Sequence, residues 1–383
     1  MIGARSTSGL AALLVLIVSC ASAYGQLYRF GKNKVQFDRF EWQMMETEHF
    51  DLYFYPEEAE LASFTAPMAE AGFRHAESKF GYTVQRRIPL IIYSSHVYFE
   101  QTNIIPGYLP EGVAGFTEFL KGRVALPLSG SLPEFERVLY HELIHVFMFD
   151  MVRHVLRSRG ITEYRPGPLW FSEGLAEYWS SEWDSRASMI IRDALFSSRL
   201  VPISLMYQVN GTFQMYKEGQ SICEYMAQRY GEDVFERILH NWWRAETFAE
   251  VFELTTGEPL RKLDESWQYD LKKRILPVIE DADPPSQMAT VLTSSGFNLK
   301  PSVARTGSDA AADSQHVLYF SNTQGYTQIV RQSAGGGGVE VVVEGERAAE
   351  FESLHAFVSG LAVSGDGAVL AFAAKRNGRA PRV

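Results

Sequence analysis

Two histidines and a glutamate in this chain have the types and the spacing to hold a metal ion and to use it. His141, Glu142 and His145 form the pattern H-E-x-x-H within residues 131–152. Residues four apart on an α-helix lie on one face, so both imidazoles can bind one Zn²⁺. Glu142 then lies beside the open position of the metal as a general base. The alternative is a core helix that carries two histidines by chance.

The segment around this pattern has the signals of a buried helix. Ser131 and Glu134 have the spacing of a capping box, and Pro133 lies in the first turn, where its missing N–H costs little. Apolar residues follow on nearly every side, as is expected of a helix at the centre of a domain. We therefore expect the two histidines to lie inside the protein.

A catalytic zinc site needs a third protein ligand. A glycine three residues after His145 and a histidine six after it would indicate a metzincin, but these positions hold Met148 and Met151. His154 lies nine residues after His145 and half a turn off the ligand face, so we expect it at the surface or the helix end.

A second helix, beginning at Pro168, offers better candidates. It places Glu173 and Glu177 four residues apart on one face. Two carboxylates on a mostly apolar helix are costly to bury unless they are paired or bound to a metal. We expect Glu173 as the ligand and Glu177 as the partner of a ligating imidazole, with the reverse assignment open. The alternative is a solvated pair of glutamates.

These two motifs resemble those of the gluzincin metallopeptidases of the peptidase-MA-like type, whose third ligand is a glutamate on a following helix. Glu173, Gly174 and Ala176 resemble the E-G-x-A segment of that clan. The 28-residue spacing from His145 to Glu173 is longer than in the thermolysin-like and aminopeptidase branches. The wider chain is similar to secreted bacterial proteins in which this domain precedes TolB-type propeller repeats, with shorter matches at residues 30–34, 115–118 and 230–231.

The resemblance implies an α+β zincin-like metallopeptidase domain, with a mixed sheet, an active-site helix and then a helical subdomain, followed by an incomplete all-β propeller segment. The 383 residues fit two domains. We expect a targeting segment at residues 1–25 and an α/β upper subdomain with a substrate-edge strand at 26–130. The zinc-site helices and the helical subdomain follow at 131–280, a linker at 281–290, and partial TolB-like repeats at 291–383.

The first 25 residues have the features of an export signal. Arg5 precedes an apolar run at residues 10–18 that is too short to span a bilayer. Residues 21–23 offer an A-x-A cleavage site, which predicts simple secretion, whereas Cys20 could instead carry a lipid anchor. Either route predicts a protein exported from a bacterial cytoplasm, with no transmembrane span in the mature chain. Cys223 is the only other cysteine and is expected to be a buried thiol.

Strands are predicted at residues 50–55, 86–93, 112–119 and 123–128, with a helix over 57–80. Pro89 indicates that its strand is an edge or carries a bulge. In the gluzincins an edge strand near the zinc helix receives an extended peptide, a role we assign to one of the last two strands.

Gly115 and Glu118 are candidate substrate-binding residues on the first of these two strands. Residues 115–118 loosely resemble the G-x-M-E-N segment of aminopeptidases, whose glutamate binds the free amine of the substrate. Thr117 and Phe119 replace the methionine and asparagine of that segment. The alternative is that Glu118 is an exposed strand glutamate.

Residues 186–278 are predicted to be helical. Zinc peptidases usually need a donor for the tetrahedral oxyanion, and we assign that role to Tyr216, with a packing tyrosine as the alternative. The helical subdomain is expected to bury a set of aromatic residues, namely Phe213, Tyr225, Phe235, Trp242, Trp243, Phe248 and Phe252.

After the acidic linker at 281–290, short strands and glycine turns replace helices. Residues 318–325 recur in form at 370–378, an offset of 52 residues that is within the span of one propeller blade. Residues 364–367 look like the turn of a TolB-type repeat. Two copies cannot close a propeller, so we expect a truncated product or fragment.

The predicted function is that of a secreted zinc metallopeptidase acting on a peptide or protein substrate. A rival hypothesis is an envelope scaffold with a structural or vestigial zinc and a propeller that binds a protein partner. A zinc hydrolase acting on a non-peptide amide would share the same site. The net charge of −10 is spread along the chain without a basic block, so the sequence gives no support for nucleic-acid binding.

Overall fold

The structure is a computed structural model that describes residues 39–105, 109, 112–128, 131–283, 288–305, 315–345, 351, 354, 356–357, 359–364 and 367–374. The predicted export signal, with Cys20, and the match at residues 30–34 lie outside the described residues. Within them, no helix is both long and apolar enough to cross a membrane.

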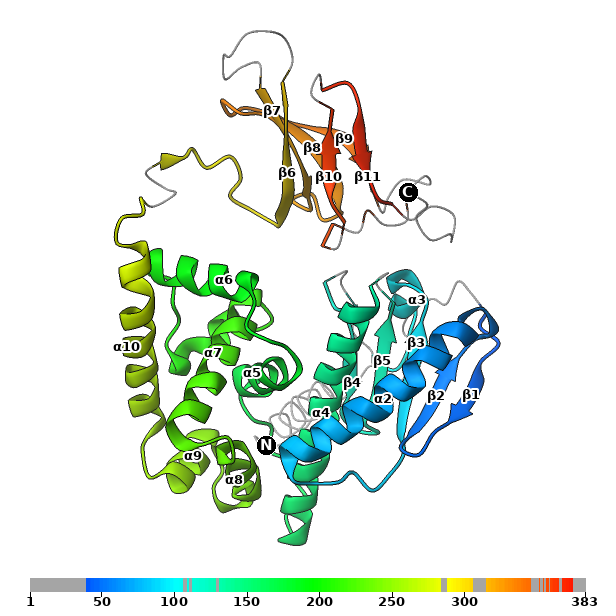
Figure 1. The fold of residues 1–383 in the computed structure, drawn as a ribbon, viewed down its shortest axis with the longest axis vertical. Helices are drawn as coiled ribbons and strands as arrows, with labels where there is room; N and C mark the ends of the chain where they lie inside the picture. The colour runs from blue at the N-terminus through cyan, green and yellow to red at the C-terminus, as the bar shows by residue number, and fades with distance from the viewer. Residues whose placement is uncertain are drawn as a thin grey trace, which may run out of the picture.

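A five-stranded mixed sheet forms the first half of the molecule (Figure 1). Its central strands β2, β3 and β5 are parallel, and β1 and β4 pair antiparallel at the two edges. The order across the sheet is β1 (Gln43–Glu46), β2 (Phe50–Phe54), β3 (Ile88–Tyr93), β5 (Arg123–Pro127) and β4 (Phe116–Glu118).

Helices cover both faces of this sheet. Alternate strand residues such as Leu90 and Ile92 pack with α2 (Ala59–Phe80) and α4 (Leu132–Ser158) in the main core. The intervening Ile91 packs with Phe99 of α3 (His96–Glu100) on the opposite face. The short helix η2 (Pro56–Glu58) leads into α2. The period of two along each strand therefore divides the core into two layers.

Two strand predictions need correction. The strand predicted over 112–119 is confined to Phe116–Glu118. It ends where the Glu118 carboxylate accepts the N–H groups of Leu120 and Lys121 and turns the chain. Pro89 lies in a central strand rather than at an edge.

The position of Pro89 costs no ladder hydrogen bond. Ile88 donates its N–H to His49 on the β2 side, so the nitrogen of Pro89 faces β5. Pairing with β5 begins one residue later, at Leu90. Pro89 therefore lies at a position where β5 does not need a backbone N–H donor from β3.

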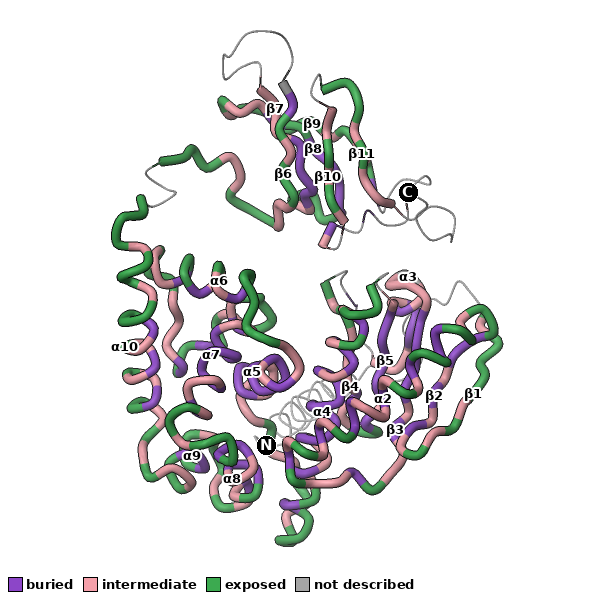
Figure 2. Tube along the Cα trace, in the orientation of Figure 1, coloured by how far each residue is buried: buried purple, intermediate pink, exposed green. Residues whose placement is uncertain are grey.

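The second half of the molecule is helical, with the buried positions gathered where the helices face one another (Figure 2). Phe213 is an exception to the predicted aromatic core, because its side chain is 55% exposed at the start of α7. Phe235, Trp242 and Phe252 are buried as predicted. The elements are α5 (Leu169–Ser180), α6 (Ser185–Phe196), η3 (Ile203–Val209), α7 (Phe213–Tyr230), α8 (Val234–His240), η4 (Trp242–Arg244), α9 (Phe248–Thr256) and α10 (Leu260–Ile279).

The last part of the chain is all β. A four-stranded antiparallel sheet follows the order β6-β7-β8-β9, and β10 pairs with β11 in a separate hairpin. Of the two recurring segments, the first begins in β7, which pairs with β6 and β8, and the described part of the second begins in β11, which pairs with β10. Among the described residues these strands form no closed propeller, and the propeller stays a prediction. The bounds are Asn298–Arg305, Gln315–Ser321, Gln328–Ser333, Val339–Glu344, Leu361–Val363 and Leu370–Phe372 for β6 to β11.

Candidate metal centre

Helix α4 carries the H-E-x-x-H pattern through the middle of the molecule. The Ser131 hydroxyl accepts the N–H of Glu134 at 3.4 Å, as the predicted cap requires. The Glu134 carboxylate does not complete a capping box but binds Arg137, at 2.7 and 3.1 Å. The helix continues to Ser158. It places His154 on its exposed face, as predicted.

Three donor atoms from two helices meet at one point. His141 Nε2 and His145 Nε2 of α4 lie 3.2 Å apart. Glu173 Oε2 of α5 lies 3.1 Å from the first of these nitrogens and 3.2 Å from the second. All three side chains are largely shielded from solvent.

This arrangement fits a zinc ion. Tetrahedral zinc with ligands at about 2.0–2.1 Å sets its ligand atoms about 3.3 Å apart, which is close to the observed triangle. The donor set is also right, because two imidazoles and one carboxylate are the ligands of many catalytic zinc sites. The three residues are one of two groups in the described part of the chain that could hold a metal. The other, Glu48, His49 and Glu70, is partly exposed.

Glu177 lies behind the first histidine. Its Oε1 is 3.2 Å from His141 Nδ1, the ring nitrogen that faces away from the donor triangle. A carboxylate at this position fixes the orientation and the tautomer of a ligating imidazole. The structure thus brings Glu173 to the donor triangle and leaves Glu177 outside it.

Two cations hold Glu177 in place. Lys217 Nζ of α7 lies 2.5 Å from Glu177 Oε2, and Arg137 Nη1 of α4 lies 3.3 Å from Oε1. Only 8% of the Glu177 side chain and 11% of the Lys217 side chain are exposed, so the pair is shielded from water. The buried carboxylate therefore remains ionised.

The protonation of the donors depends on this charge pattern. Burial by itself lowers the pKa of His141, but hydrogen bonds to Glu173 and Glu177 outweigh burial and raise it to about 10. Burial opposes ionisation of Glu173, yet His145 and the hydrogen bonds from both imidazoles hold its pKa well below the usual range. Without a metal ion, these carboxylates therefore favour a protonated His141. A metal ion that binds here must displace that proton.

Glu142 is buried beside the donor triangle and is held from the edge strand. The Thr117 hydroxyl of β4 lies 2.8 Å from Glu142 Oε2 and 3.0 Å from the backbone carbonyl of the same residue. Burial raises the pKa of Glu142, whereas the two histidines and Thr117 lower it. A carboxylate with a raised pKa in a closed site is suited to taking and returning a proton.

Gly115 makes room for that carboxylate. A Cβ atom at this position would lie 2.5 Å from the Leu126 side chain and 3.3 Å from Glu142 Oε1. Gly115 therefore bears on the site by letting its backbone approach Glu142, whereas its predicted contact with substrate stays a prediction.

Tyr216 lies beside the same centre. Its ring is 6.3 Å from that of His141. Burial raises the pKa of Tyr216 most, followed by the charges of Glu173, Glu142 and Glu177, and a hydrogen bond to Glu173 adds to the rise. The phenol therefore remains a hydrogen-bond donor at neutral pH.

Two glycines explain how α7 reaches the centre. A Cβ on Gly174 of α5 would lie 2.4 Å from the backbone of Gly219, and a Cβ on Gly219 would lie 2.5 Å from the carbonyl oxygen of Trp170. The helices thus cross in backbone contact, which brings Tyr216 and Lys217 within reach of the glutamates on α5. The E-G-x-A segment has its glycine where this crossing requires it.

Glu118 is buried at the end of β4, and its predicted role in substrate binding stays a prediction. It is 8% exposed, so it is not a solvated strand glutamate. Its carboxylate accepts hydrogen bonds from the backbone of Leu120 and Lys121 and from Arg123, at 2.8, 3.0 and 3.2 Å. These bonds occupy the group in the β4–β5 turn, and its geometry gives no support to an amine-binding role.

Thr117, Arg137 and Lys217 are parts of the site that the sequence reasoning missed. From the sequence, Thr117 is only a departure from an aminopeptidase motif. Arg137 does lie four residues before His141 on the same helix face, a spacing that could have indicated it. Lys217 follows Tyr216 directly, but nothing local links it to Glu177, which is 40 residues away.

Helix α7 also carries a buried carboxylate, Glu218, which lies apart from the donor triangle. Glu218 is fully buried and accepts hydrogen bonds from Gln214 at 2.7 Å and from the N–H of Val201 at 3.3 Å. Burial raises its pKa to about 7, although these hydrogen bonds lower it; the charge of Asp264 adds to the rise.

Comparison with known proteins gives little that bears on function. No known family model and no curated protein matches the chain. Among solved structures, Legionella pneumophila aminopeptidase A in complex with aspartic acid is similar at 13% identity and a TM-score of 0.37, over 76% of this chain and 31% of that chain. An M1 zinc metallopeptidase from Deinococcus radiodurans is similar at 15% identity and a TM-score of 0.32, over 59% of this chain and 51% of that chain.

The chain thus spans about a third of the length of the first of these proteins and about half of the second. With TM-scores this low, we rest no argument on the likeness.

Proposed function

We propose that the protein is a zinc-dependent metallopeptidase, with His141, His145 and Glu173 as the zinc ligands. The observation that supports this most directly is the triangle of donor atoms with sides of 3.1–3.2 Å, next to the buried carboxylate of Glu142. A structural zinc site needs no base, whereas a hydrolytic one does.

Zinc in this site would polarise the scissile carbonyl and a water molecule. Glu142 takes the proton of the water and later passes it to the leaving amine. Thr117 holds the Glu142 carboxylate in position by its hydroxyl. Tyr216 donates a hydrogen bond to the oxyanion that develops on the former carbonyl. Glu177, held by Lys217, fixes the ring of His141.

The outer edge of β4 is the proposed binding site for the peptide backbone. Among the described residues, β4 pairs with β5 on one side only, so its other edge is free to bind an extended chain. Thr117 of this strand contacts Glu142, which brings a peptide bound at the edge next to the general base. Of the two strands considered, β5 is interior and β4 is the edge.

We also propose export and a partner-binding role for the last segment. Residues 1–25 support secretion or lipid anchoring at Cys20, through their apolar run and cleavage motifs. The recurrence of residues 318–325 at 370–378 supports a TolB-like propeller segment that binds a protein partner. Peptide or protein is the substrate class.

The test is metal content and peptide hydrolysis of the full chain. We expect near-stoichiometric zinc, lost in Glu173→Ala and mostly kept in Glu177→Ala. Glu142→Gln should keep zinc and abolish turnover of a peptide library. Zinc lost only in Glu177→Ala would move the ligand assignment. Hydrolysis by Glu142→Gln at the wild-type rate would contradict the mechanism, and bound zinc without any hydrolysis would favour the scaffold.

A further inference from the structure

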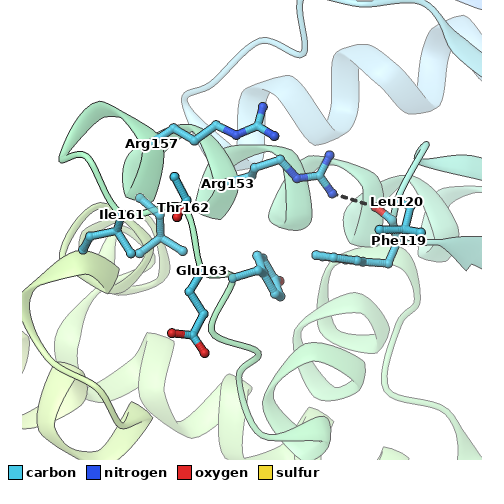
Figure 3. A pocket seen from close by; sticks show the side chains of 9 residues that line it. Phe119, Leu120, Arg153, Arg157, Ile161, Thr162 and Glu163 are labelled. Atoms are coloured by element: carbon cyan, nitrogen blue, oxygen red, sulfur yellow. Dashed lines mark hydrogen bonds between the residues drawn. The ribbon is translucent and has the colours of Figure 1, made fainter. Parts of the chain in front are cut away.

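A cavity of about 280 Å³ lies where the end of β4, the last turns of α4 and the loop between α4 and α5 meet (Figure 3). Phe119, Arg153, Arg157, Glu163 and Tyr164 are among the residues that line it. None of these residues has a part in the proposed mechanism. The cavity is therefore distinct from the residues that carry out the proposed reaction, and the side chains that line it indicate which ligand it can bind.

Aromatic rings connect the cavity to the metal centre. The ring of Phe149 stacks on that of His145, with centroids 5.8 Å apart. Phe149 in turn contacts two rings of the cavity wall, Phe119 at 5.4 Å and Tyr164 at 6.4 Å. The cavity thus begins one side chain beyond a candidate zinc ligand.

The edge strand leads to the same place. Phe119 follows β4 directly and lies two residues after Thr117, which contacts Glu142. Two strand residues span about 7 Å, and a bound peptide advances by the same rise per residue. A peptide on the free edge of β4 would therefore reach the cavity with a side chain about two or three positions from the bond beside Glu142.

The chemistry of the cavity is that of a hydrogen-bond donor set. Arg153 donates to the Phe119 carbonyl at 2.6 Å and lies 4.9 Å above the Phe119 ring, so its guanidinium is fixed. Arg157 is exposed one turn further along α4, and its guanidinium makes no ion pair or hydrogen bond with the part of the chain that the structure describes. Burial raises the pKa of Tyr164 to about 12, against the charge of Arg153, so its hydroxyl keeps its proton.

The charge balance favours an anion. Figure 3 shows both guanidinium groups on one side of the cavity, while the carboxylate of Glu163 points away from them. Glu163 is the one acidic residue in the described wall, so the wall carries two positive charges and one negative charge. Guanidinium groups donate but cannot accept, and their planar fork matches a carboxylate.

We propose that this cavity binds a carboxylate of the peptide substrate, two or three residues from the bond that is cleaved. The inference rests on the proposed peptidase function, since it assigns a specificity pocket to that site. The carboxylate could come from an acidic side chain or from the C-terminus of the peptide, because the donors are the same for both.

The experiment measures binding without cleavage. Fluorescent peptides are titrated by anisotropy into the zinc-loaded full chain carrying Glu142→Gln. One peptide series moves a single glutamate along a neutral sequence, and a twin series has glutamine at each position. At the best position, we expect the glutamate peptide to bind about tenfold more tightly than its twin, as for a charge-assisted hydrogen bond at a partly exposed site. The advantage should shrink as salt is raised.

Substitution of the free arginine decides the assignment. Arg157→Gln in the same background should reduce the preference to about twofold or less. Arg186→Gln, which removes another exposed arginine, from α6, should leave it unchanged. A preference that survives Arg157→Gln, equal binding of the twins, or no binding of any glutamate peptide would overturn the proposal.

Peptides with an amidated C-terminus separate the two sources. A preference kept on amidation identifies an acidic side chain, and one lost on amidation identifies the terminal carboxylate. Failure of the peptidase proposal would be seen separately, as wild-type enzyme that binds the preferred peptide but does not cleave it. Binding itself needs no turnover, so the pocket is tested in either case.

Discussion

Replacing Lys217 with methionine tests whether the charges behind His141 maintain the metal centre. Methionine keeps much of the apolar length of lysine and removes its charge. The change leaves Glu177, whose side chain is 8% exposed, without the Nζ atom 2.5 Å from its Oε2. Because Glu177 Oε1 faces His141 Nδ1 at 3.2 Å, the loss should reach the metal ligand.

The magnitude follows from burial. Removing one partner of a buried ion pair costs about 3–5 kcal/mol when the other charge is left alone. Arg137 stays 3.3 Å from Glu177, so we expect about 2–3 kcal/mol in the free energy of unfolding. Zinc affinity should fall about 10- to 100-fold, as for other groups that orient a ligating histidine.

The assays are urea unfolding of the zinc-free chain and zinc competition against a chelator. Lys79→Met is the matched control, because Lys79 and Glu232 form an ion pair with 33% and 46% of the side chains exposed. It should cost less than about 1 kcal/mol and leave zinc affinity unchanged. In a Glu177→Gln background, Lys217→Met should cost no more than that control. Equal effects of Lys217→Met and Lys79→Met would refute the reasoning.

Three further predictions concern other parts of the fold. Thr117→Val removes the hydroxyl that contacts Glu142 and should lower the rate of peptide hydrolysis about tenfold with zinc retained, while Thr117→Ser keeps most of the rate; equal rates for threonine and valine would contradict the assigned role. Gly174→Ala should lower the free energy of unfolding by about 1–3 kcal/mol or more, because its Cβ meets backbone at 2.4 Å, whereas Gly338→Ala, with nothing within 4 Å, should be nearly neutral in thermal denaturation. Glu218 has a pKa raised from 4.5 to about 7, so the stability it contributes is fully present below pH 4.5 and is lost as the pH rises through about 7. The loss is about 3 kcal/mol, and Glu218→Gln should remove that slope from urea midpoints measured against pH.

Local periodicity predicts which candidate ligands share a helix face. His141 and His145 share a helix face because they are four apart, and the same spacing relates Glu173 to Glu177 on α5. The cost of burying two carboxylates indicated that one of them would face a histidine. Burial and ion pairs in the structure agree with that reasoning.

Contacts between segments distant in sequence could not be foreseen in this way. Thr117 meets Glu142 only because β4 lies at the edge of the sheet beside α4. Phe213 was expected in the core from its residue type, yet it begins α7 at the surface. The missing N–H of Pro89 predicts an edge strand or a bulge, but the start of the neighbouring strand determines whether that donor is needed.

The contact of α5 with α7 at Gly174 and Gly219 has a mechanical consequence. Two helices whose backbones touch resist rotation and sliding, because either motion brings backbone atoms into a clash, so the crossing holds Glu173 and Tyr216 in register. The two histidines belong to α4, which shares one apolar core with the sheet on one side and with α5 on the other. An ion bound by all three ligands would therefore join this helix pair to α4 at a place where Arg137 and a shared apolar core already hold α5 against α4.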